Sequence, residues 1–527
     1  MTRLAALAAF ACLLGAAAPP RPTPNAPPGP APAPSARSSP DPAREAEWED
    51  PRTEAFIRAV DWTALEGVLV QEGGRKKPLG ALAREVLWRI LNAQGYRGQP
   101  PVFTYLSIGF DPAWEQEHAV KAGHPELAKA LGGKRVSLMD LGSDAFETLR
   151  NAVEPESPGP RDRAVLDLEQ RATRLRDILG TLKVLPGKEG APWVSMADPG
   201  APAASVPAFN AFVEMERAYA SRDAAAFDAS AALWASACRA ASPAAYADSS
   251  SSAALEMLYY RIQPFRWGCL GYFLAFLAYL GAWVFGKPGL KRGALGLLLV
   301  AFALHGLGMA ARVVIAGRPP VSNMYEVILY VAWAVVAVSF LVEGVMRQGV
   351  TPLPASGMAA LGLVAPALFP FIEGVVHSPM PLDPHIGQLQ AVLKSNYWLT
   401  VHVCTITTSY AILFLGFATG IWHLVSRDEA ADRVAYRVNQ LGFLFLTCGI
   451  LTGAWWANAS WGRYWGWDPK ETGSFIAWCL YGAYLHLRLF GFLKPRGAAW
   501  LTVAGFVAIL FTMIGVGYFL PGLHSYA

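Results

Sequence analysis

Charged residues are scarce in this chain of 527 residues: only 16% are Asp, Glu, Lys or Arg, whereas soluble domains contain about a quarter. Hydrophobic residues make up 53%, and several apolar runs reach the length of about 20 residues that a membrane-spanning helix needs. This composition excludes an ordinary water-soluble enzyme and indicates a membrane protein. The net charge is only +4 and no long Lys/Arg run is present, so we expect no nucleic-acid partner.

Paired cysteines are also lacking, because none of the six cysteines forms a C-x-x-C or C-x-x-C-H sequence. This excludes a thioredoxin-like reductant and a chain that is itself a c-type cytochrome. Cys238 is the only cysteine between residues 44 and 260. No internal disulfide is therefore expected in that region.

The N-terminal half divides by composition into three parts. Residues 1–18 contain a short apolar run after Arg3, which is typical of a signal peptide or an N-terminal anchor. Residues 19–43 are rich in Pro, Ala and Ser, and predict a disordered linker. Residues 44–260 then predict an exported, mainly helical domain, with helices near 165–182, 208–238 and 253–262.

From Trp267 onward, hydropathy predicts an all-α, polytopic membrane helix bundle with about eight spans: 267–286, 293–315, 325–345, 353–372, 397–425, 438–454, 473–490 and 498–518. One set of alternate connections with its flanks carries ten Lys and Arg residues and the other set carries seven. The positive-inside rule assigns the richer set to the cytoplasm. This orientation agrees with an exported N-terminal domain.

Tryptophan is concentrated in the expected external loop 455–472. Six of the eighteen tryptophans lie between residues 455 and 478. An aromatic belt at the membrane interface is one interpretation, but such a belt needs only one or two tryptophans per helix end. We favour a platform for a planar apolar ligand with anionic edges. Trp461 and Trp465 would share one helix face, Gly462 and Gly466 would allow close approach, and Arg463 and Lys470 would meet the anions.

Two histidines are expected on the same side as this loop. His402 lies one to two turns into the fifth span, and His524 follows the eighth. Two histidines from separate elements can hold haem iron from both faces, although a structural role is as common for a single histidine near a membrane edge. His486 lies deep in the seventh span, where polar groups usually face the bundle interior or a functional path.

These features carry a resemblance to a known family. The string Trp461–Glu471 resembles the WWD signature of haem-handling proteins in cytochrome c assembly. The segments 396–402, 318–326 and 518–527 resemble the CcsA/ResC branch of system II cytochrome c biogenesis. The resemblance covers roughly residues 293–527.

The resemblance implies a subunit of a holocytochrome c synthase in the bacterial cytoplasmic (inner) membrane, with haem b as its bound substrate. It implies that His402 and His524 are the axial ligands of the haem iron and that His486 lies on the haem route. It further implies a haem cradle formed by the loop, including Trp461, Gly462, Arg463, Trp465, Gly466, Trp467 and Asp468. The implied partners are a CcsB/ResB-type membrane protein and an apocytochrome c bearing C-x-x-C-H. A thioredoxin-like thiol reductant would keep the client thiols free.

Two alternative functions stay open: a haem delivery or export subunit without synthase activity, and a membrane protein that transfers electrons through b-type haems. From the residues themselves we favour structural roles for Asp468 and Glu471, because Glu471 near the start of a helix suits the helix dipole. The sequence does not assign a role to residues 44–260 or to His305.

Overall fold

A computed structural model describes residues 51–154, 159–187, 191–196, 198, 205–376, 382–387, 396–516 and 520. The expected signal peptide, the linker and His524 lie outside the described residues. Contacts between residues divide the chain into two compact units. The first contains Lys76–Gln116, Thr173–Ser249 and the described residues before Gly73, and the second contains Gly73–Arg75, Glu117–Ala172 and the chain from Ser250 onward.

The first unit is mainly helical. Its helices are α3 (Pro51–Ala59), α4 (Thr63–Glu66), α5 (Leu79–Leu91), α6 (Pro101–Phe110), α10 (Val206–Ser221) and α11 (Ala224–Ala241), with the short strands β1 (Leu69–Glu72), β2 (Arg75–Pro78), β5 (Lys183–Leu185) and β6 (Val194–Ser195). Aromatic rings form much of its core: Phe56 packs edge-on against Tyr219 and Phe227. Burial of such large apolar rings is the main driving force for folding of this unit.

The single helix expected near 208–238 is two helices, α10 and α11. Arg222 adopts a left-handed conformation with φ 56° and ends α10. Asp223 begins α11 by accepting a hydrogen bond from the Ala226 backbone N–H at 3.0 Å. A side-chain cap of this kind stabilises a helix start by about 1 kcal/mol.

The second unit contains β3 (Val120–Lys121), α7 (Pro125–Ala130), β4 (Arg135–Val136), α8 (Asp144–Asn151), most of α9 (Pro160–Arg176) and the larger part of α12 (Pro243–Ile262), in addition to the bundle described below. The strand β3 pairs antiparallel with β4. The expected helix over 165–182 is α9, which buries Val165, Leu168 and Ala172 but ends at Arg176. The third expected helix is the second half of α12.

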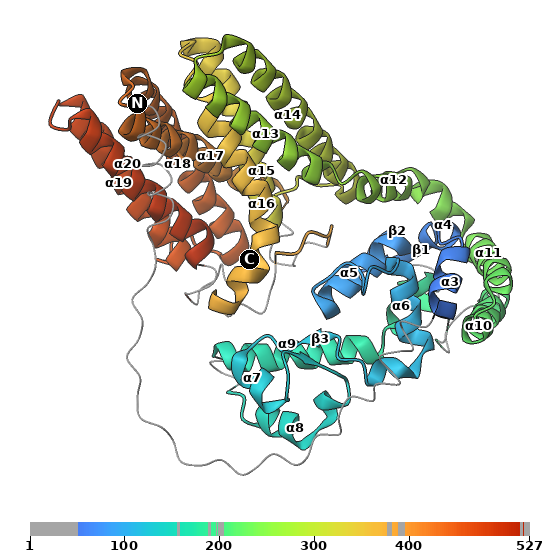
Figure 1. Cartoon of the computed structure of the whole chain (residues 1–527). Coiled ribbons are helices and arrows are strands. Elements are labelled where there is room, and N and C mark those ends of the chain that lie inside the picture. The colour runs from blue at the N-terminus through green and yellow to red at the C-terminus, as the bar shows by residue number, and fades with distance from the viewer. Residues whose placement is uncertain are drawn as a thin grey trace. The chain divides into compact units, whose positions relative to one another are not determined.

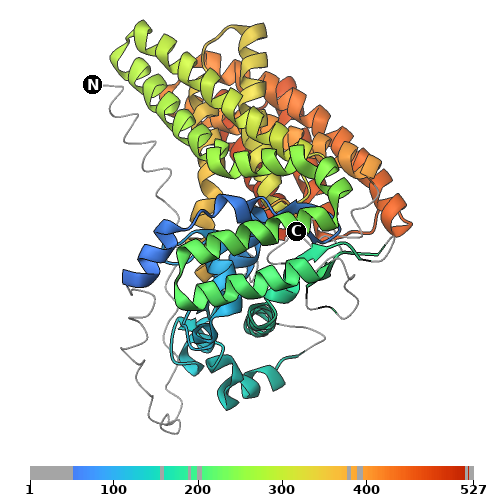
Figure 2. The same ribbon diagram turned by 90° about the vertical axis from the view of Figure 1, so that its right-hand side faces the viewer.

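Each of the eight predicted spans coincides with a helix: α13 (Pro264–Phe285), α14 (Pro288–Ala316), α15 (Met324–Met346), α16 (Pro352–Val376), α17 (Asn396–Ser426), α18 (Glu429–Trp461), α19 (Pro469–Leu489) and α20 (Pro495–Leu510), the last continuing as a π-helix to Gly515. Six helices of the described chain are long and apolar enough to cross a membrane, and these six do not include α16 and α19. Neighbours in space follow the order α14, α13, α16, α15, α17, and α17 then contacts both α18 and α20. Figures 1 and 2 show these helices as one bundle. The predicted all-α polytopic membrane fold is confirmed.

Glycine permits the close approach of α17 and α18. A Cβ at Gly442 would lie 2.4 Å from Leu413 Cδ2, and a Cβ at Gly449 would lie 2.7 Å from Ile406 Cδ1. Small residues let membrane helices pack closely enough for van der Waals contact along their length. This contact fixes α17 against α18 near His402.

Candidate functional site

The tryptophan-rich segment is only partly a loop. The helix α18 continues through Trp455 and Trp456 to Trp461, and ends at Gly462 with φ 74°, where the Gly462 N–H donates to the Asn458 carbonyl at 2.9 Å. The loop expected at 455–472 is therefore limited to Gly462–Asp468. Trp461 ends a helix and Trp465 lies in the loop, so the two residues do not share one helix face as expected.

The end of this loop is a helix cap. The Asp468 carboxylate accepts a hydrogen bond from the Lys470 backbone N–H at 3.0 Å, and Glu471 Oε2 accepts one from the Asp468 N–H at 3.1 Å. With Pro469 at the first helical position, these bonds form a capping box that starts α19. We predicted structural roles for Asp468 and Glu471 from the sequence, and this geometry agrees with them.

The side chain of Arg463 fills the space inside the loop next to Gly466. A Cβ at Gly466 would lie 1.0 Å from Arg463 Nη1, so only glycine leaves room for the guanidinium group there. Arg463 Nη1 also lies 4.0 Å from Glu471 Oε1. The flat group that approaches the Gly466 backbone in this structure is therefore the side chain of Arg463.

His402 is held by α18. Its Nδ1 lies 3.0 Å from the Gly449 carbonyl oxygen, and its ring stacks on Trp456 with centroids 5.9 Å apart and planes 10° apart. Because a carbonyl oxygen only accepts, Nδ1 carries the hydrogen of this bond, and in a neutral ring Nε2 then carries the lone pair. Histidines that bind metals usually donate their other N–H to a carbonyl in this manner.

A missing side chain makes the space for this ring. A Cβ at Gly453 would lie 2.7 Å from His402 Cε1 and 2.9 Å from His402 Nδ1. Both distances are shorter than the contact of about 3.5 Å that non-bonded atoms prefer. The helix α18 therefore supplies the hydrogen-bond acceptor, the stacking partner and the gap for His402.

A pocket lies beside His402. Its volume is about 190 Å³ and it is partly open to the outside, so it is smaller than the about 300–1,000 Å³ of typical small-molecule pockets. Its wall combines residues from the start of α15, from α17, α18 and α19, from the loop and from the end of α20: Val321, Ser322, Asn323, Met324, Val327, Leu399, His402, Val403, Ile406, Thr407, Tyr410, Ile450, Gly453, Ala454, Trp456, Ala457, Tyr464, Trp465, Lys470, Glu471, Ser474, Thr512 and Met513. The wall is mostly apolar, with a few polar groups, as is typical of ligand sites.

The pocket brings together some of the predicted site residues. His402 and Trp465 belong to its wall, and Trp465 packs edge-on against Trp467 at 5.7 Å. Trp467 itself is 66% exposed. Trp461 packs against Trp456 at 4.8 Å, and Trp456 is a wall residue that the sequence did not single out.

His486 lies elsewhere. Its side chain is exposed on α19, with Nδ1 2.9 Å from the Gly482 carbonyl oxygen. Its depth in the span predicted that His486 faces either the bundle interior or a functional path. It does not face the interior of this chain's bundle. His305, in contrast, is fully buried on α14, where Nδ1 lies 3.3 Å from the Tyr272 hydroxyl.

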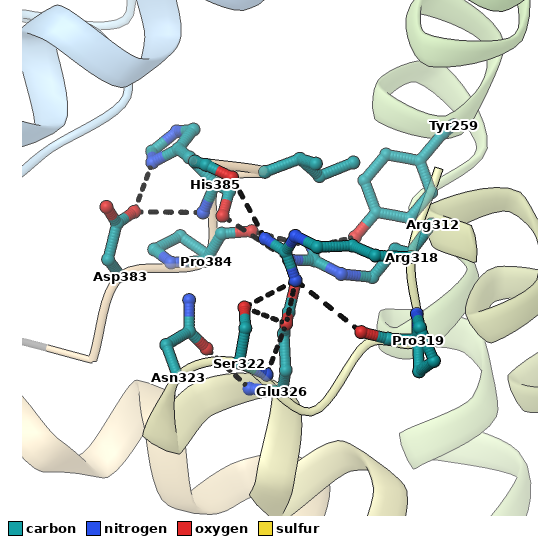
Figure 3. Close-up of polar contacts among 12 residues, drawn as sticks. Tyr259, Arg312, Arg318, Pro319, Ser322, Asn323, Glu326, Asp383, Pro384 and His385 are labelled. Carbon is teal, nitrogen blue, oxygen red and sulfur yellow. Dashed lines mark hydrogen bonds and ion pairs between the residues drawn. The ribbon is translucent and has the colours of Figure 1, made fainter. Parts of the chain in front are cut away.

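A buried ionic network supports the pocket wall at Ser322 and Asn323 (Figure 3). Arg312 and Glu326 are both 0% exposed and form an ion pair at 2.8 Å. Glu326 Oε2 also accepts from Arg318 at 3.1 Å and from the Ser322 hydroxyl at 2.7 Å. Asn323 begins α15 by accepting from the Glu326 backbone N–H at 2.8 Å. The network thus fixes the backbone of the wall at the start of α15.

The same network holds the described segment 382–387 against α14. Arg312 donates to the Pro384 carbonyl at 2.8 Å and to the His385 carbonyl at 3.3 Å, while Arg318 donates to the Gly387 carbonyl at 2.9 Å. Segment 318–326 contributed to the family resemblance, but no role was predicted for Arg312. An arginine inside an apolar span was the signal that could have identified it, because such groups are costly unless they are paired.

Comparison with known proteins gives the family. The profile of the family described as "Cytochrome C assembly protein" matches residues 321–524. The cytochrome c biogenesis protein CcsA of Synechococcus sp. (strain CC9902) is 34% identical over 283 residues, which cover 46% of this chain and 87% of that protein. The chain belongs to the cytochrome c assembly family. The matched region contains the pocket, His402 and the tryptophan-rich segment.

Two further matches are partial. Protein NrfI of Wolinella succinogenes is 38% identical to this member of the cytochrome c assembly family over 245 residues, which cover 43% of this chain and 25% of NrfI. The chain thus spans about a quarter of that relative. The solved structure of the cytochrome c haem lyase CcmF matches with 22% identity and a TM-score of 0.37, over 47% of this chain and 45% of that one. A likeness of that size carries no conclusion about function.

Proposed function

We propose that this chain binds haem b in the pocket beside His402 and presents it for covalent attachment to an apocytochrome c. The observation that carries the proposal is the state of His402. An imidazole in the wall of a largely apolar pocket, with Nδ1 donating to the Gly449 carbonyl, has the arrangement of a haem-iron ligand. The mostly apolar wall and the opening of the pocket to the outside suit a planar apolar ligand. The likeness to CcsA supports the same assignment.

The remaining parts of the proposal follow the resemblance to the CcsA/ResC branch. His524 supplies the second axial ligand, and the string that resembles the WWD signature covers the haem. The pocket faces the periplasm, as the distribution of Lys and Arg indicates. A CcsB/ResB-type protein covers the exposed side of α19 near His486. A thioredoxin-like reductant keeps the client thiols free.

The haem supplies two vinyl groups, and each adds one client thiol across its double bond to give a thioether. The protein's own contribution is positioning. The wall at Trp465 and Trp456 orients the porphyrin, and His402 holds the iron until the client's histidine replaces a ligand. Holding the reactants in a productive geometry can contribute several kcal/mol without any acid or base.

The test is the absorption spectrum of the purified chain, reduced and oxidised, beside that of His402→Ala. His423→Ala is the matched control, because His423 lies on the same helix and its Nδ1 likewise bonds a carbonyl oxygen, that of Asp428 at 2.9 Å. We expect low-spin haem bands in the wild type and the control, and weak or high-spin bands in His402→Ala. A wild type without haem after co-expression with the partner would refute the proposal.

Synthase and delivery functions are then separated in cells. The chain and its partner are expressed in a bacterium that lacks cytochrome c assembly, together with a client bearing C-x-x-C-H. Covalent haem on the client, detected by haem stain after denaturing electrophoresis, supports a synthase. Haem-loaded chain without covalent product would support delivery.

A further inference from the structure

The pocket wall contains two charged side chains that are adjacent in sequence, Lys470 and Glu471. Their surroundings differ. Glu471 Oε2 accepts from the backbone N–H groups of Gly466, at 2.7 Å, and Asp468. Glu471 Oε1 lies 4.0 Å from Arg463. The loop therefore compensates the charge of Glu471 mainly through Oε2, because Oε1 makes no hydrogen bond within the described residues.

Lys470 has weaker compensation, because the favourable charge of Asp468 does not offset the cost of burying its ammonium group. Its backbone N–H donates to the Asp468 carboxylate, which is occupied as the cap of α19. Throughout the described ranges, no hydrogen bond or ion pair involves Lys470 Nζ. An ammonium group in a mostly apolar wall is costly unless an anion pairs with it.

Arg463 is the other cation of the loop, and its position is different. Its guanidinium packs over Gly466 and beside Glu471, and Arg463 is not part of the pocket wall. Its side chain is 37% exposed. From the sequence, Arg463 and Lys470 were equal candidates for binding an anion. Their positions in the structure distinguish them.

We propose that Lys470 recognises a carboxylate of the ligand in this pocket and that Arg463 does not. The inference rests on the proposed haem site and adds the orientation of the ligand: a propionate edge lies toward the start of α19. The helix N-terminus places further positive potential at this edge. Tyr464 and Trp465, which precede α19 in the wall, then contact the apolar part of the ring.

Burial supports this assignment. Lys470 precedes the expected span at 473–490, and its burial lowers the pKa of the ammonium group to about 8. A lowered pKa means that the empty pocket disfavours the charged form, and a bound carboxylate restores it. Carboxylate recognition is therefore complete below about pH 8 and is lost as the pH rises above it.

The experiment compares haem with haem dimethyl ester, which lacks the free carboxylates. Each is titrated into the haem-free chain in detergent, and the dissociation constant is followed by absorbance. The wild type should bind haem about 10- to 100-fold more tightly than the ester, the range expected for a charged hydrogen bond. Lys470→Met should remove this preference and leave ester binding unchanged, whereas Lys470→Arg and the control Arg463→Met should keep it.

Several results would overturn the assignment. A wild type that binds haem and ester equally refutes it without any variant, as does a preference that persists in Lys470→Met or disappears in Arg463→Met. Unchanged ester binding by Lys470→Met shows that the variant is folded. If the wild type binds neither compound, the proposed haem site itself has failed, and that result differs from every outcome that concerns Lys470 alone.

Discussion

The gap at Gly453 offers the sharpest test of how His402 is held. In Gly453→Ala the new Cβ would lie 2.7 Å from His402 Cε1, about 0.8 Å short of a normal contact of about 3.5 Å. If the ring moves away by that amount, the bond of 3.0 Å from Nδ1 to the Gly449 carbonyl can no longer form. Loss of such a supporting bond typically lowers metal affinity about 10- to 100-fold. We expect haem affinity to fall by that factor.

The assay is a haem titration of the purified, haem-free chain followed by absorbance, with thermal unfolding measured in parallel. Gly420→Ala is the matched control, because its Cβ would meet Ala499 and Thr502 at no less than 3.8 Å. Alanine favours a helix over glycine by about 1 kcal/mol, so neither variant should lose stability through helix propensity. Wild-type affinity in Gly453→Ala would refute the argument that the absent side chain positions His402.

Three further outcomes follow from other contacts. Arg312→Met removes the fully buried ion-pair partner of Glu326, which then keeps only Arg318 as a cationic partner, and should destabilise the bundle by up to about 3–5 kcal/mol. Arg433→Met, at a side chain 60% exposed, should change stability by about 0–1 kcal/mol; equal melting temperatures of the two variants would contradict this. Asp468→Ala removes the cap of α19 and should cost about 0.5–2 kcal/mol in denaturant unfolding. Cys238 is 0% exposed, and burial raises the pKa of its thiol to about 12, so its thiol should be unreactive in the folded protein. In a variant that retains only this cysteine, maleimide should react at neutral pH only once denaturant unfolds the first unit. Rapid labelling of the native protein would contradict the burial of Cys238.

Hydropathy located all eight helices of the bundle because an apolar run of about 20 residues is a local signal. It misplaced the end of α18, since the polar residues Asn458 and Ser460 lower hydropathy without breaking a helix; the break comes at Gly462. The division between α10 and α11 was readable as well, because Asp223 before three alanines is a helix-start signal. These differences concern boundaries rather than the type of element.

The site could be predicted only in part, for a physical reason. His402 was identified from its residue type and its depth in a span. Its partners Gly449 and Gly453 come from another helix, and two glycines give no sequence signal of their role. The pairing of Arg312 with Glu326 likewise depends on how α14 packs against α15. Tertiary contacts of this kind have no periodicity along the chain.

The tryptophan-rich segment combines two kinds of residue that its sequence does not separate. Gly462, Gly466, Asp468 and Arg463 determine the path of the chain, since they end one helix, start the next or fill the loop. Trp465 and Lys470 belong to the pocket wall instead. Substitutions in the first group should therefore lower stability and ligand affinity together. Substitutions in the second group should change affinity or selectivity while thermal stability stays near that of the wild type. Many distinctive residues therefore lie close together in this segment, because one short loop both connects two helices and forms part of the pocket wall.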